Sequence, residues 1–104
     1  MEHTPLELLV DDEGVLWLAG ELDMATAEAF LEMASANADH RRDVVLECSA
    51  LTFLDSSGIR AILTLASHTL GKVIICNPDP PVRKVLTIAG VDEGMGVLLE
   101  PPSW

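Results

Sequence analysis

The stretch VVLECSALTFLDSSGIRAIL, residues 44–63, decides the fold because it passes from a strand pattern to a helix pattern across one polar segment. The apolar run Val44–Cys48 is typical of a strand that is covered on both faces. Leu51–Leu54 leads into the tetrapeptide DSSG at 55–58, and from Ile59 apolar residues recur at helical spacing. This stretch therefore predicts a strand, a short turn and a helix in that order.

The sequence that follows continues the alternation. Gly71 is the expected end of the helix, and Val73–Cys76 is a second buried strand. Asp79-Pro80-Pro81 is typical of a helix start, with Asp as the N-cap and Pro in the first turn. Gly90 is expected to stop that helix, and Val97–Leu99 to form a last short strand.

The sequence that precedes residue 44 predicts a hairpin and a helix. Leu6–Val10 and Val15–Ala19 are two short strands joined by a turn that contains Gly14. Asp23 is expected to be the N-cap of an amphipathic helix that runs from Met24 to about Ala38. The apolar face expected for this helix comprises Ala25, Ala29, Phe30, Met33 and Ala34.

Strand–helix–strand passages imply parallel pairing with right-handed crossovers, and the hairpin adds an antiparallel edge. The predicted fold class is α/β, with a mixed sheet of four to five strands and about three helices mainly on one face. The chain of 104 residues is expected to form a single domain, with 1–4 and 101–104 as frayed tails.

Charge narrows the range of partners. The formal net charge is −11, with six Lys and Arg against 17 Asp and Glu. Nucleic acids and anionic membrane surfaces are therefore disfavoured, since both require a basic face. A protein partner with a basic docking face is favoured. The sequence has no apolar run of membrane-spanning length and begins without a signal-like segment, so a cytoplasmic location is expected.

The usual signatures of catalysis are missing from the sequence. No G-x-S-x-G elbow is present, and His3, His40 and His68 are far apart in the chain. The sequence has no Cys/His spacing typical of zinc and no glycine-rich phosphate loop. We expect no enzyme activity, no metal and no cofactor.

Two cysteines, Cys48 and Cys76, end the two buried strands. Both are expected to be reduced core residues in a cytoplasmic protein. The alternative is a redox-responsive pair, which requires Cα atoms within about 7 Å and suitable Cβ directions.

The segment Asp55-Ser56-Ser57-Gly58 has two interpretations. Asp and Ser are good N-cap residues, so the segment can serve only to begin the helix. Alternatively, a serine here can accept a phosphate, which adds a charge of about −1.5 to −2 at a solvent-facing position. Gly58 is then expected to leave the adjacent backbone uncrowded, so that a kinase loop can approach.

Three segments, in order, carry a resemblance to the STAS-domain anti-sigma factor antagonists. They are AGELD at 19–23, VVLECSALTFLDSSGI at 44–59, and the run from Cys76 through PVRKVL at 81–86 with Gly90 beyond. A phenylalanine-containing strand followed by DSSG and a helix is the most specific of these features.

The resemblance implies a regulator of transcription in bacteria that works by partner switching. The unphosphorylated domain binds a partner that is both anti-sigma factor and serine kinase, and phosphorylation of Ser56 breaks the complex. A serine phosphatase restores it. The residues that the resemblance places at the partner surface are Gly20, Glu21, Leu22, Asp23, Asp55, Ser57 and Gly58. Arg60, which follows them on the helix, is a further candidate for partner contact. The alternative is a STAS subunit of a lipid-transport ABC complex, or of another signalling assembly, without phosphorylation.

The sequence departs from the family pattern in three places. The helix after DSSG is about one turn short, and little chain remains for a terminal helix. Arg60 stands where the family has a small residue. Three roles for Arg60 remain open: pairing with phosphate on Ser56, contact with the partner, or a solvated charge.

Overall fold

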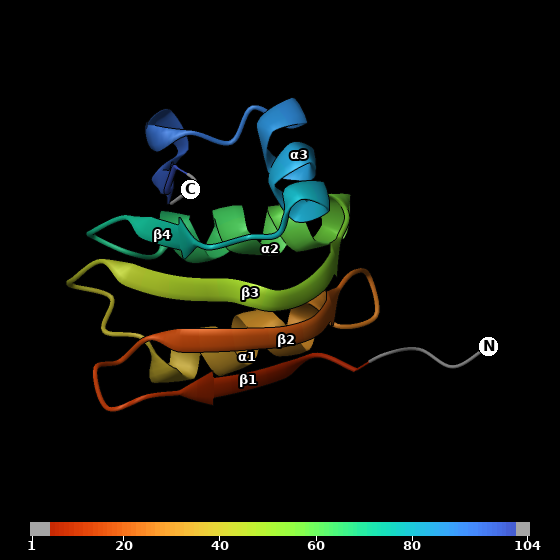
Figure 1. The fold of residues 1–104 in the computed structure, drawn as a ribbon. Coiled ribbons are helices and arrows are strands. Elements are labelled where there is room, and N and C mark those ends of the chain that lie inside the picture. The colour runs from red at the N-terminus through yellow and green to blue at the C-terminus, as the bar shows by residue number, and fades with distance from the viewer. Residues whose placement is uncertain (1–4, 102–104) are drawn as a thin grey trace.

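The computed structural model describes residues 5–101, which form a five-stranded mixed sheet in the order β1-β2-β3-β4-β5 (Figure 1). β1 and β2 are antiparallel, whereas β2, β3, β4 and β5 are parallel to one another. The predicted mixed sheet with its N-terminal hairpin is confirmed. Of the predicted tails at 1–4 and 101–104, residues 1–4 and 102–104 lie outside the described residues, and Pro101 is exposed and belongs to no helix or strand. The strands are β1 (Glu7–Val10), β2 (Leu16–Leu22), β3 (Val44–Leu54), β4 (Val73–Cys76) and β5 (Val97–Leu99).

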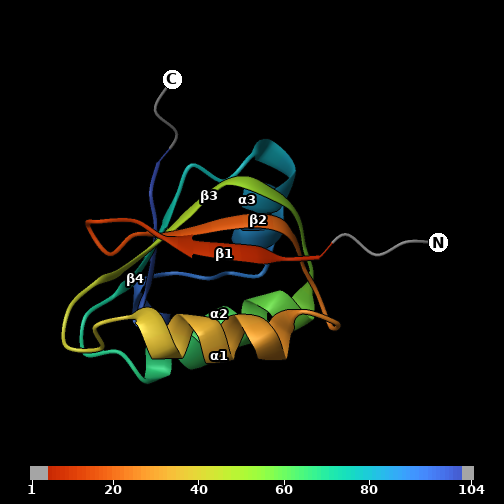
Figure 2. The same ribbon diagram turned by 90° about the horizontal axis from the view of Figure 1, so that it is seen from below.

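Three α-helices cover the sheet. They are α1 (Ala27–Asn37), α2 (Ser56–Ser67) and α3 (Pro80–Ile88), and a short 3₁₀ helix, η1 (Glu93–Met95), precedes β5. Figure 2 shows α1 and α2 side by side on one face of the sheet, with α3 on the opposite face. Two of the three helices thus share a face, as expected. Within residues 5–101, no helix combines the length and the apolar character that a bilayer crossing requires.

The hairpin turn between β1 and β2 is organised by one carboxylate. Asp11 Oδ1 accepts hydrogen bonds from the backbone N–H of Glu13 at 2.9 Å and of Val15 at 3.0 Å. The indole Nε1 of Trp17 donates to Asp11 Oδ2 at 2.9 Å. These bonds lower the pKa of Asp11, because they favour the ionised carboxyl, and the bond from Trp17 has the largest effect.

The first helix begins three residues later than predicted. Asp23 closes a separate turn, and the N-cap of α1 is Thr26, which makes no side-chain capping bond. Phe30 and Ala34 are buried as expected, but Ala25 and Ala29 are exposed. The predicted face was wrong at these two positions because Ala25 precedes the helix and Ala29 points away from the sheet.

The second helix begins at Ser56, within the DSSG segment expected to start it, and it ends at Ser67 rather than at Gly71. Leu70, predicted on its apolar face, lies beyond the helix and is 84% exposed. Gly71 instead permits a close approach of two loops, since a Cβ atom there would lie 2.6 Å from Asp43 N. β3 is one continuous strand of 11 residues with bulges against β2.

The third helix starts as predicted. Asp79 accepts a hydrogen bond from Val82 N at 3.1 Å, and Pro80 occupies the first helical position. Gly90, with φ of +73°, follows the helix as expected. The buried core contains mainly aliphatic side chains with a single aromatic one, Phe30. Its largest members are Phe30, Leu16, Leu18, Leu22, Leu46, Leu51, Ile62, Leu65, Ile75 and Leu86.

Candidate functional site

The carboxyl ends of β2 and β3 form one edge of the sheet. Leu22 pairs with Leu54 at the end of the two parallel strands, so the turns that begin at Asp23 and Asp55 are neighbours. The backbone N–H of Asp55 donates to the carbonyl of Leu22 at 3.4 Å. The sheet register therefore brings together the two segments, 20–23 and 55–60, that the sequence placed at a partner surface. We call this the switch edge.

Asp55 is the N-cap of α2. Its Oδ1 accepts hydrogen bonds from the backbone N–H of Ser57 at 2.9 Å and of Gly58 at 3.2 Å. Ser56 therefore occupies the first helical position, where it is exposed, and its hydroxyl makes no hydrogen bond within the described residues. Asp55 performs the capping, and the Ser56 side chain is left without a structural role.

Gly58 is buried where α2 passes over the end of β2. A Cβ atom at this position would lie 2.6 Å from the carbonyl oxygen of Leu22 and 2.6 Å from Leu54 Cδ1. The prediction that Gly58 leaves the backbone uncrowded for an approaching kinase loop is wrong, because Gly58 faces the interior of the protein. The glycine brings the helix close to the strand, and so positions Ser56 above the strand end.

Asp23 organises the other turn of the switch edge. Its Oδ1 accepts from Ala25 N at 2.9 Å and from Thr26 N at 3.2 Å. Thr26 Oγ1 donates to the carbonyl of Glu21 at 2.8 Å, which ties the turn to the end of β2. The turn projects Met24 into solvent, where its side chain is 83% exposed.

The predicted partner-surface residues differ in accessibility. Leu22 and Gly58 are buried and shape the switch edge from within. The others present surface to solvent: Ser56 and Arg60 are exposed, and Gly20, Glu21, Asp23, Asp55 and Ser57 are partly exposed.

A groove of about 440 Å³ runs between the N-terminal halves of α1 and α2, and Ser57, the residue after Ser56, lines it. Residues of α2 that line it include Ser57 and Arg60. Sequence reasoning missed its other wall, which consists of Met24, Ala27, Glu28 and Leu31. The sequence feature that could have indicated this wall is Met24, directly after the GELD segment at 20–23, but Met24 was assigned to the start of a helix.

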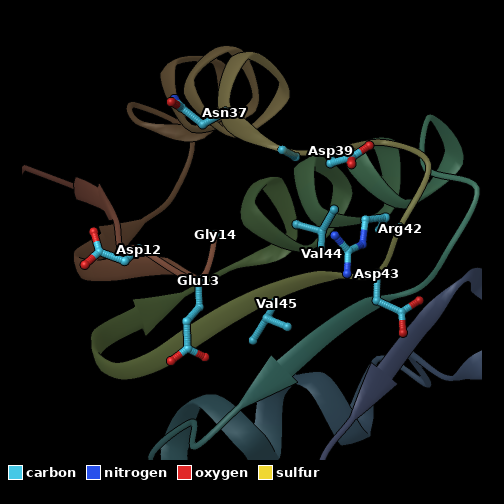
Figure 3. Close-up of a pocket in the computed structure, with 10 residues that line it drawn as sticks. Asp12, Glu13, Gly14, Asn37, Asp39, Arg42, Asp43, Val44 and Val45 are labelled. Carbon is cyan, nitrogen blue, oxygen red and sulfur yellow. The ribbon is translucent and has the colours of Figure 1, made fainter.

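Another cavity, of about 470 Å³, lies at the opposite end of β3 (Figure 3). Its wall carries the carboxylates of Asp12, Glu13, Asp39 and Asp43, which point in different directions in Figure 3. Within residues 5–101, no group of His, Cys, Asp or Glu side chains is arranged to hold a metal ion. This cavity therefore offers no chemistry comparable to the switch edge.

The two cysteines lie on neighbouring strands but on opposite faces. Cys76 pairs with Glu47, and Cys48, the next residue along β3, points to the other side of the sheet. Burial raises the pKa of the Cys48 thiol to about 12. Desolvation, followed by a hydrogen bond with Glu100, raises the pKa of Cys76 to about 12. This register does not support a direct bridge, and the redox role stays a prediction that free-thiol counting under mild oxidant tests.

The described histidines lie away from Ser56. His68 follows the far end of α2, so it is about 18 Å along the helix from the serine. His40 lies in the loop before β3, where its Nε2 is 2.9 Å from the carbonyl oxygen of Ser35. His3 lies outside the described residues. Within the described part of the chain, Ser56 has no adjacent base of the kind that a serine hydrolase needs.

Fold and site together define an α/β domain with an accessible serine at a strand–helix junction. The family model described as "STAS domain" matches residues 8–101, and the chain belongs to this family.

Named relatives refine the family assignment. The chain is 34% identical over 83 residues to an "Anti-sigma F factor antagonist" of Paenibacillus polymyxa, covering 74% of this chain and 70% of that protein. It is 30% identical to a protein of the same name from Lysinibacillus sphaericus, covering 89% of this chain and 84% of that protein.

A solved structure gives the same result. The unphosphorylated anti-sigma factor antagonist SpoIIAA superposes with a TM-score of 0.66 at 25% identity, covering 92% of this chain and 88% of that one. These relatives are regulatory binding proteins, which confirms the expectation that the chain is not an enzyme.

Proposed function

We propose that this protein is an anti-sigma factor antagonist whose binding is switched off by phosphorylation of Ser56. In this proposal the unphosphorylated domain binds an anti-sigma factor that is also a serine kinase, in the bacterial cytoplasm. A serine phosphatase resets the switch. The names of the relatives support the partner class. We also propose that residues 1–104 act as one STAS domain.

One observation carries the choice of residue: Ser56 is exposed, whereas Ser57 is only partly exposed. Asp55 makes the capping bonds to Ser57 N and Gly58 N, so the hydroxyl of Ser56 makes no hydrogen bond within the described residues. A kinase can therefore move the γ-phosphoryl group of ATP to Ser56 Oγ, with ADP leaving and the hydroxyl proton passing to the kinase. No capping bond is lost, and the positive end of the α2 dipole favours the new anion.

The phosphate acts on the complex rather than on the fold. A group with about −1.5 to −2 charges, buried against a partner without a matching cation, carries a large desolvation cost. A penalty of about 3–4 kcal/mol weakens binding several-hundred-fold. The switch edge already carries Glu21, Asp23 and Asp55, so a partner with a basic surface is expected.

The test begins with incubation of the domain with its cognate kinase and ATP, followed by mass spectrometry. We expect one phosphate, on Ser56, and none in Ser56→Ala. Ser57→Ala is the matched control and should still be labelled. Phosphate on Ser57, or label that survives in Ser56→Ala, contradicts the assignment.

Binding measurements complete the test. Ser56→Asp should weaken the complex with the anti-sigma factor, and Ser56→Ala should leave it intact. If the parent protein, Ser56→Asp and Ser56→Ala all bind the anti-sigma factor with equal affinity, the alternative is favoured. The alternative is a STAS subunit that docks in an ABC transporter or another assembly without phosphorylation.

A further inference from the structure

Arg60 lies one helical turn after Ser56. It lies four residues after Ser56 and three after Ser57 on the same helix, α2. Residues at these spacings are neighbours on a helix surface, and an acidic group N-terminal to a basic one at i,i+4 is the favourable orientation. Ser56 and Arg60 are both exposed, so the two side chains can meet in solvent.

The surrounding charges make this position unusual. α1 contains no Lys or Arg, and α2 contains only Arg60. The other basic residues lie elsewhere: Arg83 and Lys84 on α3, on the opposite face of the sheet, and Arg41, Arg42 and Lys72 in loops that precede β3 and β4. Within the described residues, Arg60 is thus the sole Lys or Arg on α1 and α2, the two helices that share the face of the sheet with Ser56.

The neighbours of Arg60 leave its guanidinium available. It lines the groove together with Ser57 and, from α1, Glu28. The structure records no hydrogen bond or ion pair of its guanidinium with another described residue. Its charge is therefore not committed to an internal contact before phosphorylation.

We propose that Arg60 is the intramolecular counter-ion of phosphoserine at position 56. The inference rests on the proposed function. The guanidinium presents several N–H donors to phosphate oxygens in a charge-assisted contact. It holds the phosphate against the first turn of α2 and favours its dianionic form at neutral pH. The contact also covers the phosphate, so that a phosphatase removes it more slowly.

The test uses protein with phosphoserine installed at position 56 during synthesis, which needs no kinase. The second pKa of the phosphate, about 6 for a free phosphoserine, is followed by ³¹P NMR across pH. We expect the acid dissociation constant to be about two- to threefold larger in the parent than in Arg60→Gln. Lys84→Gln is the matched control, because it removes one positive charge from the opposite face.

A second measurement follows the loss of phosphate with alkaline phosphatase. Release should be faster from Arg60→Gln than from the parent or Lys84→Gln. An unchanged phosphate pKa in Arg60→Gln overturns the proposal, as does an equal change in Lys84→Gln. Because the phosphate is installed chemically, this result stands apart from the proposed function, which fails if the cognate kinase does not modify Ser56.

Discussion

The two turns of the switch edge start alike and end differently. Each begins with an aspartate directly after a parallel strand, and the register places the two side by side. Asp55 caps α2 at once, so Ser56 is the first residue of that helix. Asp23 closes a separate turn, and α1 begins only at Ala27 without a side-chain cap.

This difference separates two tasks. The immediate cap at Asp55 holds Ser56 in the first turn of a helix that packs on the core, so the serine is accessible on a rigid support. The turn at Asp23 projects Met24 and forms one wall of the groove. One turn therefore presents Ser56, the proposed modification site, and the other supplies surface near it. Four predictions, from the largest expected effect to the smallest, test this comparison.

Because α1 lacks a side-chain cap, its position should depend on packing. Phe30 is fully buried, and Phe30→Ala should lower the free energy of unfolding by about 3–5 kcal/mol. Urea denaturation measures this loss. Leu70→Ala is the control, since that side chain is exposed and its removal should cost less than about 0.5 kcal/mol. A loss below 1 kcal/mol for Phe30→Ala would mean that local turns hold α1.

The close approach of α2 to β2 should be sensitive to one methyl group. Gly58→Ala should lower the free energy of unfolding by about 1–3 kcal/mol, because its Cβ would meet the Leu22 carbonyl and the Leu54 side chain. Chemical denaturation of Gly58→Ala beside Ser56→Ala, an exposed site on the same helix whose hydroxyl makes no hydrogen bond within the described residues, isolates the effect. A more stable Gly58→Ala, as helix propensity alone favours, would contradict a tight contact.

The two aspartates should differ in their contribution to stability. Asp55→Ala removes the cap of α2 and should cost about 1–2 kcal/mol. Asp23→Ala should cost less, because Asp23 is not the N-cap of α1, which begins only at Ala27. Thermal unfolding of both variants, measured together, gives the comparison. Equal losses would show that the two turns are equivalent.

Ser56 should contribute least to stability. Ser56→Ala removes a hydroxyl without a hydrogen bond in the described structure and should change the free energy of unfolding by less than about 0.5 kcal/mol. Urea titration against the parent protein is sufficient. A larger loss would mean that the serine also has a structural role, and that phosphorylation disturbs the fold as well as the complex.

Local chemistry made part of this structure predictable. Asp79-Pro80 identified the start of α3, and the spacing of apolar residues identified the order of strands and helices. The same reasoning placed α1 too early, since a good N-cap residue such as Asp23 serves equally in a turn. It also identified DSSG as a helix start, but it left open which of its residues makes the cap.

The sequence alone determined the order of elements, the hairpin and the chemistry available at the DSSG segment, because these depend on residues within a few positions of one another. Only the tertiary structure decided that Asp23 and Asp55 are neighbours, that Gly58 is buried, and that Cys48 and Cys76 face apart. These outcomes depend on strand register across 30 or so residues, where a shift by one position reverses the face of every side chain.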